Sequence, residues 1–231
     1  MKRLLALIMA ALLLFSFAAC GKDNTAADST ADSTSGIATS SDVKINTQKK
    51  EFSLGTITGN KYQSEFLGLG AEFGANWTVY TKEQIMELNT IIVDTMNDED
   101  IKEILSKADV VYDFYAINMQ DGQSVNIVFE SVDKLTAFVT TEEQYINNAL
   151  SSNLFESALE GMGYSNIQAI ESTATLLSKE RKSIRITAEI NGVTFYEELV
   201  VIKAGNHFAV ITVASLVDDM TADLFARFYS L

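Results

Sequence analysis

The chain has 231 residues, of which 47% are apolar and 10% aromatic, and this composition excludes disorder for most of its length. Its 31 acidic residues against 17 basic ones give a formal net charge of −14, which repels phosphate backbones and disfavours nucleic acid as a partner. The chain has a single cysteine and no proline, so it has no disulfide framework, and its turns depend on glycine, asparagine and aspartate.

The first predicted element is a secretory signal at residues 1–19. The start MKR carries two basic side chains, residues 4–17 are apolar and uncharged, and two alanines follow. This apolar run is shorter than the roughly 20 residues that a membrane-spanning helix needs, so cleavage is expected rather than insertion. Removal of residues 1–19 leaves 15 basic against 31 acidic residues, a formal charge of −16.

The tetrad Phe17-Ala18-Ala19-Cys20 resembles the bacterial lipoprotein box, with phenylalanine where leucine is usual. The resemblance implies that the thiol of Cys20 receives a diacylglycerol and that Cys20 becomes the first mature residue. Two acyl chains anchor a protein stably, whereas one holds it only marginally. We therefore expect the protein to lie on the extracytoplasmic face of the bacterial cell membrane, attached to that membrane through the diacylglycerol on Cys20.

Residues 20–50 are predicted to be the lipidated N-terminus and a flexible linker. From residue 21 to residue 42, all positions but Lys22 and Ile37 are Gly, Ser, Thr, Ala, Asp or Asn, a composition that cannot build a core. About thirty such residues have an r.m.s. span of roughly 30 Å. The remaining residues, 51–231, suit a single domain with one core.

The domain is predicted to begin with a hairpin and two helices. Apolar residues alternate between residues 59 and 77, with a reversal at Gly68, as in two paired strands. Thr81 and Gln84 form a capping box at the start of the first helix, and a shorter helix follows from Asp98.

A second hairpin and a long helix follow. Strands at 110–119 and 124–131 flank Asp121-Gly122, which favours a two-residue turn. The helix after them has two candidate N-caps, Thr140 and Thr141. Its apolar stripe consists of Ile146, Leu150, Leu154, Ala158 and Met162.

Four strands and a last helix complete the predicted order. The strands cover residues 167–177, 184–190, 193–202 and 208–214. Their turns are expected at 178–182, Asn191-Gly192 and Gly205-Asn206. Asp218 or Asp219 then caps a helix that buries Met220, Leu224, Phe225 and Phe228.

This order predicts an α+β domain in which helices cover the faces of an antiparallel sheet. The element order and the "Y-x-S-E-F-L-G" strand from Tyr62 to Gly68, placed before Trp77 and a helix, resemble the PsbP-like fold. The resemblance implies a layered sandwich and a role in binding or assembly rather than catalysis. It transfers no functional residues to this chain.

A two-residue turn at Asp121-Gly122 would set Asp113 directly against Glu130 and Phe114 against Phe129. Opposed like charges are unfavourable by about 0.2–1 kcal/mol. A bulge, an intervening basic side chain or a shared cation would each relieve the repulsion. Asp113 and Glu130 are therefore candidate metal ligands, although hard cations prefer six or more oxygens and only two carboxylates are visible.

The hairpin at Asn191-Gly192 places Arg185 opposite Glu198, a favourable pair, and Glu197 beside Ile186 on an apolar face. An unpaired carboxylate there is costly. A bulge near Glu197 or a thinly covered sheet face would explain it. The alternative is a ligand pocket whose polar contact is Glu197.

Aromatic residues and the single histidine are further candidates. Trp77, with Tyr62 and Tyr80, could stack on a sugar or a peptide, or it could belong to the core. His207 could act as a base or a ligand only with partners that the fold supplies, and otherwise it is a strand-end surface residue. The sequence contains no G-x-S-x-G, phosphate loop or H-E-x-x-H motif, so we expect no catalytic residue, no cofactor and no enzymatic activity.

The sequence thus indicates a lipid-anchored, non-catalytic binding or assembly protein of the bacterial cell envelope, with an envelope protein or a peptide as its partner. The alternative is a sensor or carrier for a small ligand or a cation. A third possibility is a carboxylate-dependent hydrolase. An exposed apolar patch, a closed aromatic pocket or two facing carboxylates, respectively, would distinguish these three.

Overall fold

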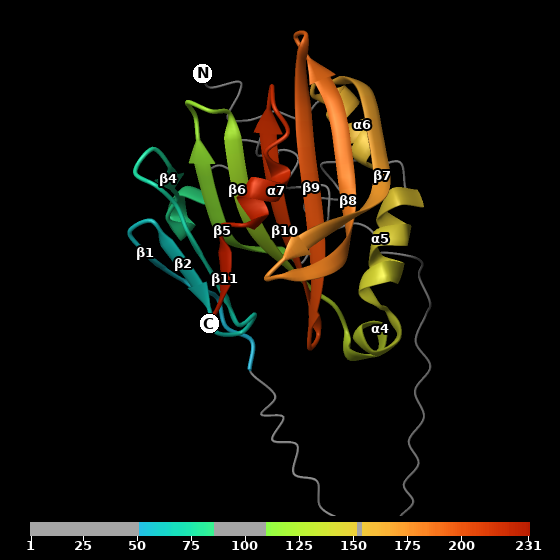
Figure 1. Ribbon diagram of the computed structural model, residues 1–231. Helices are drawn as coiled ribbons and strands as arrows, with labels where there is room; N and C mark the ends of the chain where they lie inside the picture. Colours follow the sequence, from blue (N-terminus) through green and yellow to red (C-terminus); the bar gives the residue numbers. More distant parts are fainter. Residues whose placement is uncertain (1–50, 86–109, 152–153) are drawn as a thin grey trace, which may run out of the picture.

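The structure is a computed structural model that describes residues 51–85, 110–151 and 154–231 (Figure 1). The signal, Cys20 and the linker lie outside the described residues, as does the helix predicted from Asp98. Within the described residues the chain forms eleven strands and four complete helices, and residues 82–85 are the first turn of a further helix.

Seven strands form one large sheet in which every neighbouring pair is antiparallel. From one edge to the other the strands are β4 (Thr78–Val79), β5 (Val110–Asn118), β6 (Gln123–Ser131), β10 (His207–Leu216), β9 (Val193–Ala204), β8 (Lys179–Ile190) and β7 (Ser165–Leu176). Strands β7, β8, β9 and β10 follow one another in sequence and form a meander, because tight turns join each strand to the next.

A second, smaller antiparallel sheet joins the two ends of the domain. Its strands, in spatial order, are β1 (Thr56–Thr58), β2 (Lys61–Ser64), β3 (Leu69–Glu72) and β11 (Phe228–Ser230). Tyr62 lies opposite Ala71 as the alternating pattern predicts, and both side chains are fully buried. The last strand of the chain thus pairs with one of the first.

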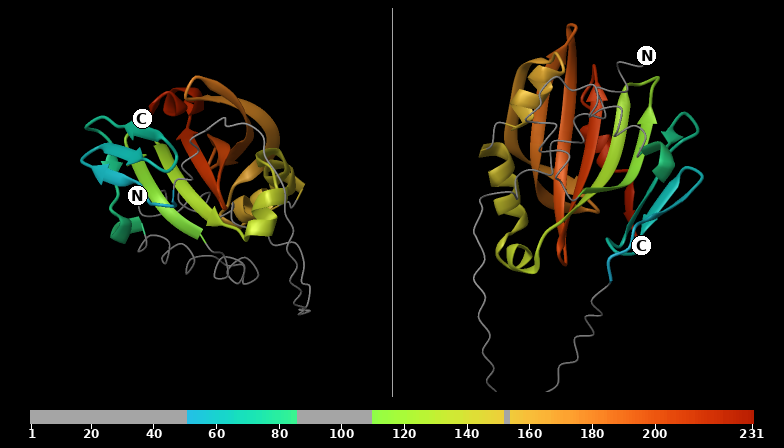
Figure 2. Two further views of the ribbon diagram at one scale, coloured as in Figure 1. Left: turned by 90° about the horizontal axis from the view of Figure 1, so that it is seen from below. Right: turned by 180° about the vertical axis from the view of Figure 1, so that it is seen from behind.

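Different elements pack on the two faces of the large sheet (Figure 2). Helices α5 (Glu142–Ser151) and α6 (Leu154–Gly161) pack on one face through Tyr145, Ile146, Phe155 and Leu159. The small sheet and helix α7 (Thr221–Phe225) pack on the other. Side chains alternate between the faces along each strand, so two apolar clusters form, one on each side of the sheet.

The predicted α+β sandwich of helices around a sheet is wrong. The fold is mostly β, with two antiparallel sheets, and helices make up a minor part of the described residues. The error arose partly at the C-terminus, where a helix was expected to continue to Phe228. The helix ends at Phe225, and Phe228 instead begins β11, whose pairing with β3 completes the second sheet.

Several local predictions are confirmed. The side chains of Thr81 and Gln84 cap reciprocally, and Thr141 with Gln144, not Thr140, caps α5 in the same way. Around Asn191-Gly192 the register is the predicted one, with Arg185 opposite Glu198 and a 3.3 Å contact between their charged groups.

Two turns differ from the prediction. The β7–β8 connection is not 178–182 but Leu177-Ser178, both with positive φ (54° and 60°), a conformation that neither residue type favours. The β5–β6 connection is a four-residue loop at 119–122 rather than a two-residue turn. Asn118 holds this loop, because its side-chain oxygen accepts hydrogen bonds from the backbone of Gln120 and Asp121.

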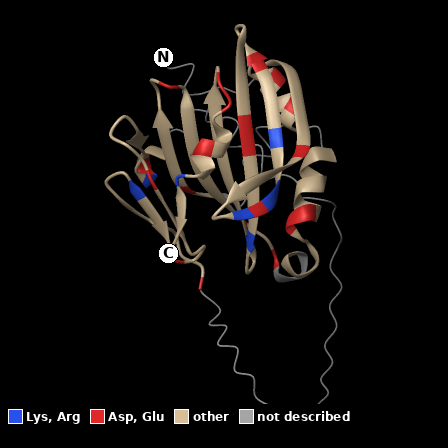
Figure 3. Cartoon of the chain, viewed as in Figure 1, with Lys and Arg blue, Asp and Glu red and all other residues tan. Residues whose placement is uncertain are grey.

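Figure 3 shows acidic and basic residues interspersed on strands β8 and β9. The ion pairs there include Lys182 with Glu171 at 2.9 Å and Arg185 with Glu198. Arg185 also contacts Asp219 in front of α7, and Asp219 accepts a hydrogen bond from the hydroxyl of Thr221. These pairs fix the short α7 against the sheet.

Val217 has a φ of 75°, a strained angle for a β-branched residue, which lets its N–H donate to the carbonyl of Thr194 at 2.9 Å. Its side chain is 66% exposed, so little packing is lost on removal. We expect Val217→Gly to raise the free energy of unfolding by up to about 1 kcal/mol, the relieved strain less the entropy of glycine. Urea unfolding measures this. The matched change Val193→Gly, in a strand, should destabilise instead, and equal effects at the two sites would contradict the prediction.

Candidate functional site

Four buried polar residues lie on adjacent strands, on the face of the large sheet that α5 and α6 cover. We call them the polar strip: Tyr115 on β5, Asn126 on β6, Thr212 on β10 and Glu197 on β9. Tyr115 is opposite Asn126, and Asn126 is opposite Thr212. Directly opposed residues have Cβ atoms about 5 Å apart, so these three are neighbours.

Glu197 extends the strip diagonally. Its direct neighbours are Ile186 and Ala214, which belong to the apolar cluster under the helices. Thr212 faces Leu199, two residues along β9 from Glu197 and on the same face. The register at Glu197 is regular and its side chain is 1% exposed, so neither a bulge nor a thinly covered face explains its place.

The strip is unusual because its polar atoms have no partners. Both carboxyl oxygens of Glu197, Oδ1 of Asn126 and the hydroxyls of Thr212 and Tyr115 are buried without a hydrogen bond. Most buried polar groups in native proteins are paired, and each exception costs about 1–3 kcal/mol. The strip places such unpaired groups on four adjacent strands, and this loss of stability indicates that the residues are kept for a function.

Burial also changes the acid–base chemistry of the strip. It raises the pKa of Glu197 from 4.5 to about 8, so this carboxyl is mainly protonated at neutral pH. The protonated group offers one donor and one or more acceptors. Burial, and then the charge of Glu197, raise the pKa of the nearby Tyr164. The strip is therefore a neutral set of hydrogen-bonding groups in an apolar wall.

A second buried carboxyl group, that of Glu130, lies on the same face and can be compared with that of Glu197. Burial raises its pKa to about 7, but its carboxylate accepts a 2.6 Å hydrogen bond from the hydroxyl of Tyr145. Glu130 pairs with Phe208 and Glu197 with Ala214, so six residues of β10, roughly 20 Å, separate the two carboxyls. The two carboxyls do not face each other, and only Glu197 lacks a partner.

The predicted pairing of Asp113 with Glu130 is wrong. The longer loop shifts the register, so Phe114 faces Ile127 rather than Phe129, and Asp113 lies in a bulge. Asp113 accepts hydrogen bonds from the N–H of Gly55 and from Tyr62, on the side of the small sheet, whereas Glu130 contacts Tyr145 on the other side. The two carboxylates therefore do not share a cation, and Asp113 is a structural anchor.

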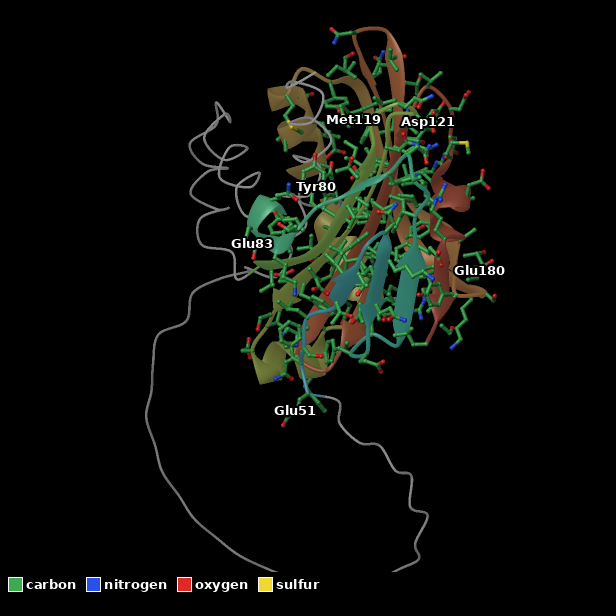
Figure 4. All side chains as sticks on the ribbon, turned by 90° about the vertical axis from the view of Figure 1, so that its left-hand side faces the viewer. Glu51, Tyr80, Glu83, Met119, Asp121 and Glu180 are labelled. Atoms are coloured by element: carbon green, nitrogen blue, oxygen red, sulfur yellow. The ribbon has the colours of Figure 1, made fainter. Side chains whose placement is uncertain are left out.

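Trp77 and Tyr62 belong to the core rather than to an exposed stacking site. Trp77 is buried against Phe73, and the guanidinium of Arg227 lies 5.0 Å from its ring centroid. Tyr62 is fully buried beside Phe114. Tyr80, labelled in Figure 4, packs its ring 5.1 Å from that of Tyr115 at the end of the polar strip.

His207 begins β10 and is partly exposed in an aromatic cluster. Its ring stacks on Phe52 at 4.0 Å and contacts Phe66 and Phe129 edge-on. Across residues 51–85, 110–151 and 154–231, no group of three or more His, Cys, Asp or Glu side chains is arranged to hold a metal. In the same residues no helix has the length and hydropathy to span a bilayer.

The sequence indicated Glu197 but not its companions. Asn126 and Thr212 each interrupt a short apolar run, VNIVF on β6 and VITVA on β10. In a strand buried on both faces, a lone polar residue is the available signal. Only the pairing of β6 with β10 shows that these two positions, 86 residues apart in sequence, are neighbours.

Comparison with known proteins leaves the chain without a family. No family model and no curated protein matches it. A crystal structure from Bacteroides thetaiotaomicron, at 1.50 Å resolution, aligns with 76% of this chain at 11% identity and a TM-score of 0.38. The alignment covers 49% of that protein, so the chain spans about half its length.

A second structure is LpqN of Mycobacterium tuberculosis, a protein involved in cell envelope biogenesis. It aligns over 70% of this chain and 82% of its own at 12% identity, with a TM-score of 0.35. Superpositions this loose establish neither a shared fold nor a shared role. The residues of the chain itself must therefore indicate its function.

Proposed function

We propose that this protein is a lipid-anchored, extracytoplasmic binding protein that holds a small, uncharged, hydrogen-bonding ligand against the polar strip. The anchoring part rests on the lipoprotein box at Cys20. The binding part rests on one observation: Tyr115, Asn126, Thr212 and Glu197 bring buried polar atoms without partners to one face of the sheet.

The chemistry of the strip favours a neutral ligand. A charged ligand would need an opposite charge, and the carboxyl of Glu197 is mainly protonated at neutral pH. A hard cation would find a single carboxylate where it prefers six or more oxygens. The wall contributed by Ile186, Leu199 and Ala214 is apolar. The ligand should therefore combine an apolar body with hydroxyl, amide or carbonyl groups.

The two other hypotheses, a hydrolase and a protein that binds a large envelope partner, receive less support. A carboxylate-dependent hydrolase requires two carboxyl groups less than about 10 Å apart across a cleft, and Glu130 and Glu197 are about twice as far apart. A large envelope partner would favour a continuous apolar surface. Apart from two small pairs, Phe52 with Leu54 and Phe138 with Val139, the exposed large apolar side chains of the described residues occur on separate elements.

The test is native mass spectrometry of the mature protein, purified from its own envelope in mild detergent. We expect wild-type protein to carry a small non-protein mass that denaturation releases. Thr212→Val, which removes a hydroxyl and keeps the shape, should reduce that occupancy about tenfold, as expected for a lost buried hydrogen bond. Asn126→Leu should reduce it further.

The matched control is Thr175→Val, an exposed threonine on β7 that lies outside the strip. This variant should retain the wild-type occupancy. Two results would contradict the proposal: wild-type protein free of any such mass, or a mass retained equally by Thr212→Val and Thr175→Val.

A further inference from the structure

The end of the domain at the β9–β10 turn carries the most exposed large apolar side chain among the described residues. Phe138, on the short helix α4 (Lys134–Val139), is 85% exposed, and its neighbour Val139 is 59% exposed. A protruding phenylalanine beside a valine is unfavourable in water and is typical of a surface that contacts an apolar phase.

Helix α4 is fixed at this end. The N–H of Val132 donates to the carbonyl of Asn206, in the β9–β10 turn, at 3.0 Å. On the far side of the helix, the Nζ atom of Lys203 donates to the carbonyl of Thr140 at 2.8 Å. These bonds tie both flanks of α4 to the same end of the β9–β10 hairpin, so Phe138 is held outward.

The linker enters the domain at the same end. Phe52 stacks on His207, the first residue of β10, and is itself 38% exposed. In Figure 4 Glu51 lies at this end of the molecule, while Met119 and Asp121 lie at the opposite end. Figure 1 shows α4 at the same end as the point where the linker enters.

We propose that this end of the domain docks on the bilayer that holds the Cys20 lipid, with Phe138 and Val139 in contact with the membrane interface. The inference rests on the proposed lipid anchor. The linker has a relaxed span of roughly 30 Å, so it brings Glu51 close to the bilayer. The opposite end lies a further ~40 Å away, the length of the 12-residue β9.

The contact is apolar rather than electrostatic. A mature chain with a formal charge of −16 is repelled by anionic headgroups, so a basic patch is not what holds it to lipid. An apolar helix corner that is already tethered needs only weak intrinsic affinity, because the linker keeps the local lipid concentration high.

The test uses the mature, lipidated protein in phosphatidylcholine vesicles, with a nitroxide label at Phe138→Cys. Cys20 is the only cysteine in the chain, so its lipidation leaves the introduced thiol as the sole labelling site. Collision rates of the label with oxygen, which concentrates in lipid, and with a water-soluble nickel complex report its surroundings. The matched control is Val217→Cys, also exposed and apolar but bonded to Thr194 near the opposite end of β9.

We expect the oxygen-to-nickel collision ratio at residue 138 to rise severalfold on incorporation into vesicles, with no change at residue 217. Flotation with the vesicles checks the anchor separately. Protein that floats while residue 138 stays as accessible to nickel as residue 217 would overturn the docked orientation and leave the anchor intact. Protein that neither floats nor carries lipid on Cys20 would overturn both proposals.

Discussion

Replacing Glu197 by leucine should stabilise the ligand-free protein, by about 1–3 kcal/mol at neutral pH. Leucine is only about one methylene group larger than glutamate, and it would contact Ile186 and Ala214 without two unpaired oxygens in an apolar wall. Urea unfolding of the two proteins measures the difference. A variant that is more stable but no longer retains the ligand would indicate that the chain keeps Glu197 for binding.

The same substitution should change the pH dependence of stability. Burial raises the pKa of Glu197 from 4.5 to about 8 in the folded chain, so between these values the unfolded chain loses the proton while the folded chain keeps it. The contribution of Glu197 to the free energy of unfolding should therefore be most favourable in acid and fall by roughly 1 kcal/mol per pH unit up to about pH 8.

A second variant, Glu197→Gln, compared with Glu197→Leu, separates the effect of the titration from the effect of the unpaired oxygens. Glu197→Gln removes the titration but keeps unpaired polar atoms, so it should flatten the pH profile with little gain in stability in acid. Glu130, with a folded-state pKa of about 7, contributes a fall of the same sign at lower pH in all three proteins. The wild-type profile minus that of Glu197→Gln isolates Glu197, and a flat difference would refute the prediction.

Asp113→Ala should destabilise the protein by about 3–5 kcal/mol. The carboxylate is fully buried and accepts a 2.6 Å hydrogen bond from the hydroxyl of Tyr62 and bonds of 2.9 Å from the N–H of Gly55. Its loss would leave both donors unpaired between the two sheets. Because these bonds tie the small sheet to β5, the effect should appear in thermal and urea unfolding alike.

Tyr62→Phe provides the matched control, since it removes one donor together with its hydrogen bond. Its cost should be about 1 kcal/mol. In the Tyr62→Phe background, Asp113→Ala should cost less than in the wild type, because one fewer donor is left unpaired. Equal costs in both backgrounds, or a cost below about 0.5 kcal/mol in the wild type, would show that Asp113 is not the anchor.

The parts of the fold that were predictable are those with local causes. Asn191-Gly192 fits a tight turn with positive φ at both positions, and the alternation beside it fixed the register that pairs Arg185 with Glu198. The β7–β8 turn escaped prediction because Leu177 adopts positive φ against its own preference. Leu177 packs against the core on the small-sheet side, a tertiary contact that its sequence neighbours do not indicate.

The β5–β6 register failed for a similar reason. Asp121-Gly122 favours a two-residue turn, but Asn118 captures the backbone of a four-residue loop, and a bulge at Asp113 follows. The shift moved Phe114 from Phe129 to Ile127, which share a face, so the core was unaffected. The bulge redirected Asp113, which no alternating pattern could indicate.

Only one residue of the candidate site, Glu197, could be predicted from the sequence. Glu197 stood out because the hairpin register placed a carboxyl among apolar side chains. Tyr115, Asn126 and Thr212 became its companions through the pairing of β6 with β10. The sequence indicates the hairpin partner of each strand, β5 and β9, but not that β6 and β10 pair with each other. A polar residue in a buried strand can be found from sequence, but its neighbours across the sheet cannot.

The position of β11 has a consequence for the order in which the domain can fold. Strand β3 acquires its second neighbour only from residues 228–230, at the end of the chain, and the N–H of Leu231 donates to the carbonyl of Gly68. The small sheet therefore cannot close before residues 228–230 have been made. Its pairing joins Ala71 to Phe228, 157 residues later, and such a long-range contact forms late and slows folding.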